Sequence, residues 1–385
     1  MALFDCRTEY DADAYAAVVR EERLARTRTV FANVFFGAGV GDAGAHGYLC
    51  CGSSSGAISV FNLDDVLRRS RDATRGAAAD SGEIAPAVVI RAHVGAAYAV
   101  VTYGDELLCT AGEDGRTLIF KVTDVVAAAD AALAAGTPAV DADVRPVASF
   151  ANPQERKSRG ALGPVPETTA LATDPSGGLV FAAAGDGACY GWDAREGREA
   201  PAAVLRGHAD LLHCVAARPG ANQAVTGSED GTVRIFDVRS EKATSVIDPW
   251  RAEEARSRGG GAVGGGSWVG CVALDEAENW LGMGCGGGCV TMWSFAAGAC
   301  VSRFAASAPL QALRLRGDNV VAAGAEPAVY RWNLAGRLMS RQPCTPESVF
   351  ALDMRGASLT AVGGAGGVVD LFSELGTRVG TVRCA

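Results

Sequence analysis

One spacing recurs seven times in this chain and restricts its possible folds more than any other feature. A turn residue, glycine or in one case proline, is followed five positions later by an aromatic residue near the end of an apolar run. The pairs are Gly56 and Phe61, Gly115 and Phe120, Gly187 and Trp192, Gly231 and Phe236, Gly288 and Trp293, Pro327 and Trp332, and Gly367 and Phe372. The aromatics are 39 to 72 positions apart, as expected of a repeat of about 40–45 residues that carries insertions.

Short apolar segments surround each of these pairs. The stretch from 205 to 247 is the clearest, because LLHCVA, QAVTG, TVRIFD and ATSVI are four candidate strands separated by turn residues. One such unit cannot bury both of its faces, so neighbouring units must pack against each other. We predict an all-β fold in which residues 28–385 form a seven-bladed β-propeller of four-stranded sheets. The segment 378–384 is predicted to complete the seventh sheet, so that the ring closes without a shared strand.

The remaining segments lie before the first blade or interrupt the repeat. Residues 1–27 are predicted to be a flexible N-terminal segment with a short helix over 11–27, where apolar residues recur near helical spacing. Insertions occur near 127–145, 152–167 and 250–266. The first contains VVAAADAALAAG and is expected to form a helix joining blades two and three, while the Gly-rich tip of the third is expected to be disordered. They are either tolerated surface loops or sites of partner contact.

Two sets of polar residues recur at equivalent positions of the second and fourth repeats. The sets are His93, Thr110 and Asp114, and His208, Thr226 and Asp230. A histidine, a threonine and an aspartate at this spacing can form a buried hydrogen-bond chain across one blade. We therefore predict a structural role for both sets and no catalytic role.

Charge and composition exclude several classes of function. The net charge of -9 argues against a broad nucleic-acid surface, which needs clustered Lys and Arg. No apolar run approaches the length of a membrane span, so no membrane contact is expected. The 12 cysteines are expected to be mostly buried free thiols, and Cys285 and Cys289 lack a second pair at zinc-site spacing.

Motifs of catalysis are missing from the sequence as well. There is no GxxxxGK[ST] phosphate loop and no G-x-S-x-G elbow, and only four histidines could supply base chemistry. We predict no catalytic residue, no cofactor and no metal site, and therefore a protein that is not an enzyme.

The repeats resemble the WD-repeat family, most directly at Gly207-His208 and Trp192-Asp193. Within it, the chain is similar to the THO subunit 6 family through LCCGSSSGAISVFNLDDVL, SWVGCVALDEAENWLGMGCGGGCVTMWS and VYRWNLAGRLMSRQ. The resemblance implies a WD40-type propeller that serves as a noncatalytic scaffold in the THO part of the nuclear transcription–export assembly. It also implies contacts with other THO subunits, subunit 5 in particular, and only an indirect relation to RNA. The expected role is to help couple transcription and splicing to mRNA export.

A second hypothesis comes from another class of protein. Some propellers resemble substrate receptors of cullin-4 ubiquitin ligases, which contact the ligase adaptor through a W-D-x-R box. Its residues would be Trp192, Asp193 and Arg195 in one copy, and Phe236, Asp237 and Arg239 in a second copy with Phe replacing Trp. The alternative interpretation is an ordinary end of a third strand, whose arginine pairs with a neighbouring acid.

Overall fold

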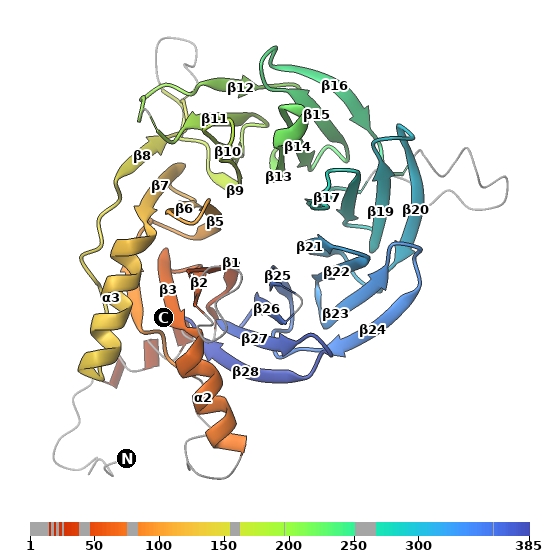
Figure 1. The fold of residues 1–385 in the computed structure, drawn as a ribbon. Coiled ribbons are helices and arrows are strands. Elements are labelled where there is room, and N and C mark those ends of the chain that lie inside the picture. The colour runs from red at the N-terminus through yellow and green to blue at the C-terminus, as the bar shows by residue number, and fades with distance from the viewer. Residues whose placement is uncertain are drawn as a thin grey trace.

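A computed structural model places seven four-stranded antiparallel sheets in a ring around a central channel (Figure 1). It describes residues 15–16, 19–20, 23–24, 27–37, 47–74, 84–154, 162–195, 197–250, 267–356 and 358–385. Each sheet is one blade and is built from four strands that are consecutive in the chain. The predicted seven-bladed β-propeller is therefore confirmed.

The strands occupy the following ranges. Blade one holds β1 (Val30–Phe36), β2 (Tyr48–Ser53), β3 (Ala57–Asn62) and β4 (Val88–Arg91), and blade two holds β5 (Ala97–Tyr103), β6 (Leu107–Gly112), β7 (Arg116–Lys121) and β8 (Ala148–Ala151). Blade three holds β9 (Thr168–Asp174), β10 (Leu179–Ala184), β11 (Cys189–Asp193) and β12 (Ala203–Leu205), and blade four holds β13 (Leu212–Arg218), β14 (Gln223–Ser228), β15 (Val233–Asp237) and β16 (Lys242–Ile247). Blade five holds β17 (Val269–Leu274), β18 (Trp280–Cys285), β19 (Cys289–Ser294) and β20 (Ala299–Ala305), and blade six holds β21 (Leu310–Arg316), β22 (Asn319–Gly324), β23 (Glu326–Asn333) and β24 (Leu338–Pro343). Blade seven holds β25 (Val349–Arg355), β26 (Leu359–Gly364), β27 (Val368–Ser373) and β28 (Arg378–Arg383), and a 3-10 turn, η1 (Pro219–Ala221), separates β13 from β14.

The hydrophobic core lies between neighbouring blades. The aromatic residue of the third strand is buried in six blades, and only Trp293 in blade five is half-buried. Trp192 of blade three, for example, belongs to one cluster with Cys109 and Phe150 of blade two. These aromatics therefore hold adjacent blades together, which explains why the spacing is repeated in every unit.

One of the seven turn residues is placed differently from the prediction. Pro327 lies inside β23 and is not in the turn, because the turn in blade six is tighter and pairs Gly324 directly with Glu326. The backbone carbonyl of Pro327 accepts a hydrogen bond from the N–H of Cys344, which begins the connection to blade seven. Pro327 stands at an irregularity of the register and has no paired residue in β22 or β24, so a residue without an N–H is tolerated there.

Helix α2 (Leu63–Thr74) lies between β3 and β4 and was not predicted from the repeat. The side chain of Asn62 caps its first turn by accepting a hydrogen bond from the N–H of Asp65 at 3.0 Å. Leu63 and Val66 are buried at helical spacing and pack in one cluster with Val382 of blade seven. A cap, an acidic first turn and this spacing are all visible in the sequence and could have revealed the helix.

Helix α3 (Val122–Ala135) corresponds to the helix expected in the first insertion, but its predicted place was wrong. It lies within blade two, between β7 and β8, and does not join blades two and three. Its inner residues, including Val125 and Ala129, are buried in one cluster with strands of blade one. Gly136 ends the helix in the left-handed region with φ of 68°. The helix thus covers the outside of the first two blades beside α2 (Figure 1).

Blade one and blade seven meet at a seam that contains no shared strand, as predicted, because β28 belongs to blade seven. Strand β25 contacts β1 on the inside, and α2 packs on β28 on the outside. Ile84 forms a parallel bridge with Val382, and the Arg28 guanidinium donates a hydrogen bond to the carbonyl of Cys384 at 3.0 Å. Both ends of the propeller sequence therefore contribute to closing the ring.

Several predictions concern segments that lie wholly or partly outside the described residues. Of residues 1–27, seven are described and all seven are helical. The described part excludes residues 155–161 of the second insertion and 251–266 of the third. The prediction of disorder at the Gly-rich tip therefore concerns residues outside the described part. Among the helices within the described ranges, none combines the length and apolar character that crossing a membrane requires.

Candidate functional site

Every first strand of the propeller contains a β-bulge at its second position. In each blade one residue has no partner in the register with the second strand. These residues are Phe31, Tyr98, Thr169, His213, Gly270, Gln311 and Phe350. All seven line a single cavity of about 440 Å³, together with Glu167, Leu211 and Trp268. We call these ten residues the channel mouth. A bulge re-aims the side chain of its unpaired residue, and here it does so around the whole ring.

Aromatic rings form much of the wall of the channel mouth. The ring of Phe31 meets Tyr98 edge-on at 5.1 Å and Phe350 at 5.5 Å between centroids. On the other side, the imidazole of His213 lies 5.4 Å from the indole of Trp268. All five side chains are only half-buried, so part of each ring faces the cavity. Such rings can bind apolar groups or cations.

Carboxylates give the channel mouth a negative character. Burial, and then the carboxylates of Glu167 and Glu113, raise the pKa of Tyr98, and Glu167 also lines the cavity. His213 Nε2 lies 2.5 Å from an oxygen of the exposed Glu229. Because the aromatic rings bring no positive charge, the wall favours a cationic group over an anionic one.

Two amide side chains that line the channel, those of Asn33 and Gln311, have buried atoms without a hydrogen-bond partner among the described residues. Asn33 is 3% exposed, and neither its oxygen nor its nitrogen has a hydrogen-bond partner within the described ranges. The same holds for Oε1 of Gln311. The guanidinium of Arg314 also lines the channel, but Arg314 Nε is 3.2 Å from the carboxylate of Asp353. Polar atoms that are buried this deeply normally have a partner, so these amide atoms are exceptions among the described residues.

The two predicted sets of polar residues are each brought together within one blade. His93 Nδ1 lies 3.0 Å from Asp114 and its Nε2 lies 2.9 Å from the hydroxyl of Thr110. In blade four the corresponding distances from His208 to Asp230 and Thr226 are 2.9 and 2.8 Å. Both imidazoles are buried, with 0% and 1% of their side chains exposed. Each ring therefore uses both nitrogens in fastening its blade and has none left for a substrate.

Burial sets the protonation of these residues. It lowers the pKa of both histidines, and the neighbouring carboxylates offset this only in part. Burial raises the pKa of Asp230, but hydrogen bonds from Thr232, Ala209 and His208 outweigh it and lower the pKa to about 2. Each histidine is therefore neutral, with Nδ1–H donating to the carboxylate and Nε2 accepting from the threonine hydroxyl.

These shifts predict that acid destabilises the fold. The unfolded histidine has a pKa near 6.5, and the folded pKa is lower, so the unfolded chain binds more protons below that pH. The contribution of each neutral histidine to the free energy of unfolding is fully present above pH 6.5. It is lost as the pH falls toward the lowered pKa of the folded protein. From about pH 7.5 to 5.5 we expect a loss of about 1 kcal/mol per histidine. Urea unfolding at both pH values should show a smaller loss for His208→Gln, and an unchanged loss would contradict the assignment.

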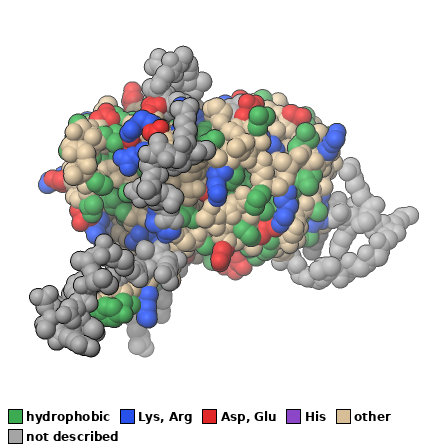
Figure 2. Space-filling model, turned by 90° about the horizontal axis from the view of Figure 1, so that it is seen from below, with side chains coloured by type: hydrophobic (Ala, Val, Ile, Leu, Met, Phe, Trp, Pro, Cys, Tyr) green, Lys and Arg blue, Asp and Glu red, His purple; other side chains and the backbone are tan. Residues whose placement is uncertain are grey.

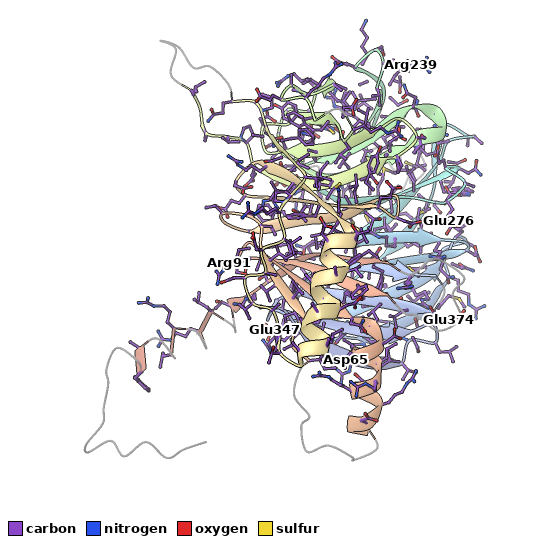
Figure 3. All side chains as sticks on the ribbon, turned by 60° about the vertical axis from the view of Figure 1, so that its left-hand side comes forward. Asp65, Arg91, Arg239, Glu276, Glu347 and Glu374 are labelled. Carbon is purple, nitrogen blue, oxygen red and sulfur yellow. The ribbon has the colours of Figure 1, made fainter. Side chains whose placement is uncertain are left out.

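The two candidate adaptor motifs lie on the face of the ring opposite the channel mouth. Their aromatic residues, Trp192 and Phe236, are each 1% exposed and belong to the core. The arginines are exposed at the turns after the third strands of blades three and four. Arg195 donates a hydrogen bond to the carbonyl of Pro175 at 2.9 Å, and Arg239 lies at the outer edge of the molecule (Figure 3).

The aspartates of these motifs serve their own turns. Asp193 accepts a hydrogen bond from the N–H of Arg195 at 2.8 Å, and Asp237 accepts one from the N–H of Ser240 at 2.8 Å. The backbone and side chain of Ser240 lower the pKa of Asp237. Two arginines on one face of adjacent blades are therefore accessible, while the aromatic and acidic positions have structural partners.

Among the side chains that the structure describes, no group of three or more His, Cys, Asp or Glu residues could hold a metal ion. The channel mouth itself was missed by sequence reasoning, which placed the inner strands but not their bulges. A bulge depends on the register between two strands, and the sequence offers no direct signal of it.

Comparisons with known proteins relate this geometry to a family. The WD40 family model (WD domain, G-beta repeat) matches residues 199–237. The chain is 34% identical over 380 residues to THO complex subunit 6 of Arabidopsis thaliana, covering 98% of both chains. It is 27% identical to THO complex subunit 6 of Homo sapiens, covering 86% of this chain and 87% of that one. Among solved structures, the WD40 β-propeller domain of Doa1 matches with a TM-score of 0.61 at 14% identity, which bears on the fold alone.

Proposed function

This chain belongs to the THO complex subunit 6 family of WD-repeat proteins, and we propose that it is a noncatalytic scaffold subunit of a THO complex. The alignment with the Arabidopsis relative carries the proposal, because it covers 98% of both chains and so includes all seven blades. The proposed place of action is the nucleus, in the THO part of a transcription–export assembly. There the subunit would help couple transcription and splicing to mRNA export.

The proposed partners are proteins, with subunit 5 of the complex foremost and RNA reached only through neighbouring subunits. The net charge of -9 supports this, since nucleic-acid surfaces need clustered cations. On the side of the molecule seen in Figure 2, Lys and Arg side chains are scattered among hydrophobic and acidic ones. His93 and His208 are fully used within their blades, which supports a noncatalytic role.

We propose that one docking contact lies at the channel mouth. Its occupant is a segment of another subunit that inserts an arginine or lysine side chain. The half-buried rings of Phe31, Tyr98 and Phe350 offer π faces to a cation. Glu167 supplies a carboxylate in the wall, and the polar side chains of Thr169 and Gln311 line the same cavity. A guanidinium carries five donors and no acceptor, so it matches this set of acceptors.

Affinity purification with mass spectrometry tests both parts of the proposal. The tagged full-length protein is expected to co-purify with THO subunits, and their absence would contradict the scaffold role. Glu167→Gln should weaken the mouth contact about tenfold, because it removes one charge-assisted hydrogen bond. Glu374→Gln is a matched control, since Glu374 is exposed in the turn after β27, beside the end of β25 that is remote from Phe350. If THO subunits co-purify equally with both variants, the mouth is not the docking site and the family-level role remains.

A second candidate function, as a receptor that docks on a cullin-4 ligase adaptor, is favoured by one observation. Arg195 and Arg239 are both exposed on the same face of adjacent blades. In the same purification, the ligase adaptor should then co-purify with the wild-type protein and be lost from Arg195→Ala and Arg239→Ala. The Glu167→Gln variant should retain it, because the mouth lies on the other face. If the adaptor does not co-purify with the wild-type protein, or if it co-purifies with both arginine variants, this candidate function is removed.

A further inference from the structure

Two cysteines face each other across the hairpin of blade five. Cys285 ends β18, Cys289 begins β19, and the two are direct partners in the antiparallel register. Three glycines connect them, and the N–H of Gly288 donates to the carbonyl of Cys285 at 3.1 Å. Opposed residues of antiparallel strands have Cα atoms about 4.5–5.5 Å apart, within the range that a disulfide spans. The backbone therefore already holds the pair in position to be joined.

Two tryptophans cover the turn between the cysteines and explain its composition. A Cβ on Gly287 would lie 2.2 Å from the ring of Trp250, and one on Gly286 would lie 2.4 Å from the ring of Trp268. Any larger residue at either position would displace an indole. The close packing fixes the turn, and with it the relative positions of the two sulfurs.

One sulfur of this pair accepts a hydrogen bond from a cationic side chain. The guanidinium of Arg303 donates a hydrogen bond to Sγ of Cys289 at 3.0 Å and lies over the ring of Trp250 at 4.2 Å. The hydrogen bond from Cys285, opposed by burial and helped by Arg303, lowers the pKa of Cys289 below that of an ordinary thiol. The pKa of Cys285 is raised by the same hydrogen bond and by burial. One sulfur is therefore prepared as a thiolate and the other as the thiol beside it.

We propose that Cys285 and Cys289 form a peroxide-sensitive thiol pair that oxidises to a disulfide across the blade-five hairpin. The Cys289 thiolate attacks one oxygen of hydrogen peroxide, forming a sulfenic acid and releasing hydroxide, which leaves as water with the proton that Cys289 gave up on ionising. The sulfur of Cys285 then attacks the sulfenic sulfur, and the departing hydroxyl leaves with the Cys285 proton as a second water. Two thiols are oxidised by two electrons and one peroxide is reduced. The disulfide no longer carries the charge that Arg303 contacts.

The chain contains an internal control for this proposal. Cys51 and Cys384 are also buried and hydrogen-bonded to each other, at the seam between blades one and seven. Burial comes first among the causes that raise the pKa of Cys51, and the neighbouring thiols Cys384 and Cys50 raise it further. In this second pair the Arg28 guanidinium donates to the backbone carbonyl of Cys384, whereas the Arg303 guanidinium donates to the sulfur of Cys289. Comparing the two pairs separates the effect of Arg303 from that of contact alone.

The test treats the reduced full-length protein with hydrogen peroxide, blocks the remaining thiols with N-ethylmaleimide and maps disulfides by peptide mass spectrometry. We expect the Cys285–Cys289 disulfide to form about tenfold faster than a Cys51–Cys384 disulfide. Arg303→Gln should slow it about tenfold, and Arg303→Lys, which keeps the charge, should restore part of the rate. In Cys285→Ser, Cys289 should stop at the sulfenic acid and react with dimedone.

Three outcomes would overturn the proposal. The first is that the two pairs oxidise at equal rates, and the second is that Cys285 and Cys289 stay reduced under peroxide. The third is that an Arg303→Gln variant with the wild-type melting temperature forms the Cys285–Cys289 disulfide at the wild-type rate. If Arg303→Gln does not fold, the comparison between the two pairs in the wild-type protein still decides the question.

Discussion

Replacing Trp192 by alanine is expected to lower the free energy of unfolding by about 4 kcal/mol, the largest effect expected of a single substitution in this propeller. The indole is 1% exposed and stacks on Phe150 at 5.1 Å between centroids with an interplanar angle of 13°. Because Phe150 belongs to blade two and Trp192 to blade three, the cavity would open between the blades. Urea unfolding followed by circular dichroism measures the change.

The matched control is Trp192→Phe, with an expected cost of about 1 kcal/mol. Phenylalanine occupies the equivalent position in four other blades, at Phe61, Phe120, Phe236 and Phe372. Nε1 of Trp192 has no hydrogen-bond partner in the part of the chain that the structure describes, so removing it leaves no described acceptor unsatisfied. If the phenylalanine variant is as unstable as the alanine variant, the stacked area is not the cause of the stability.

The second large effect is expected from Asp370→Ala, at about 3 kcal/mol. This carboxylate is 0% exposed and lies on β27 of the last blade. It accepts hydrogen bonds from the N–H of Thr345 at 2.6 Å and from the hydroxyl of Thr381 at 2.6 Å. Thr345 belongs to the connection from blade six and Thr381 to β28. The carboxylate thus joins three segments, and its removal leaves their donors without this acceptor.

Asp318→Ala is the control for this prediction and should cost less than about 0.5 kcal/mol. Asp318 is exposed and accepts one backbone hydrogen bond, from Leu334 at 3.3 Å. Thermal unfolding of the two variants beside the wild type distinguishes them. Equal melting temperatures for Asp370→Ala and Asp318→Ala would mean that Asp370 does not fasten the last blade.

The sequence was sufficient to predict the blades because their signals are local and repeated. A turn glycine followed by an aromatic marks the second and third strands of six blades, and every blade contains the four strands expected from the repeat. The polar sets built on His93 and His208 could be predicted for the same reason, since their residue types recur at matching offsets. Repetition supplies a comparison within one chain that a single motif lacks.

Features that depend on pairing or tertiary contact could not be predicted in this way. Asp370 stands in an apolar segment where an aspartate suggests exposure, and only the connection from blade six explains its burial. The residues of the channel mouth face the cavity because of bulges, which shift the alternation of side chains by one position. Helix α2 is a different case, because its cap at Asn62 is a local signal but lies outside the repeated pattern of strands.

The position of Ala385 decides how the protein can be handled in the purification experiments. Its N–H donates a hydrogen bond to the hydroxyl of Ser59, and its carbonyl accepts from Ser55 at 3.3 Å, both in blade one. An affinity tag fused after Ala385 would start inside these contacts and compete with them for the same surface. A tag placed before Met1 is separated from Arg28, the first residue of the seam, by 27 residues of chain. Tagging that end keeps the two halves of the seam together while partners are captured.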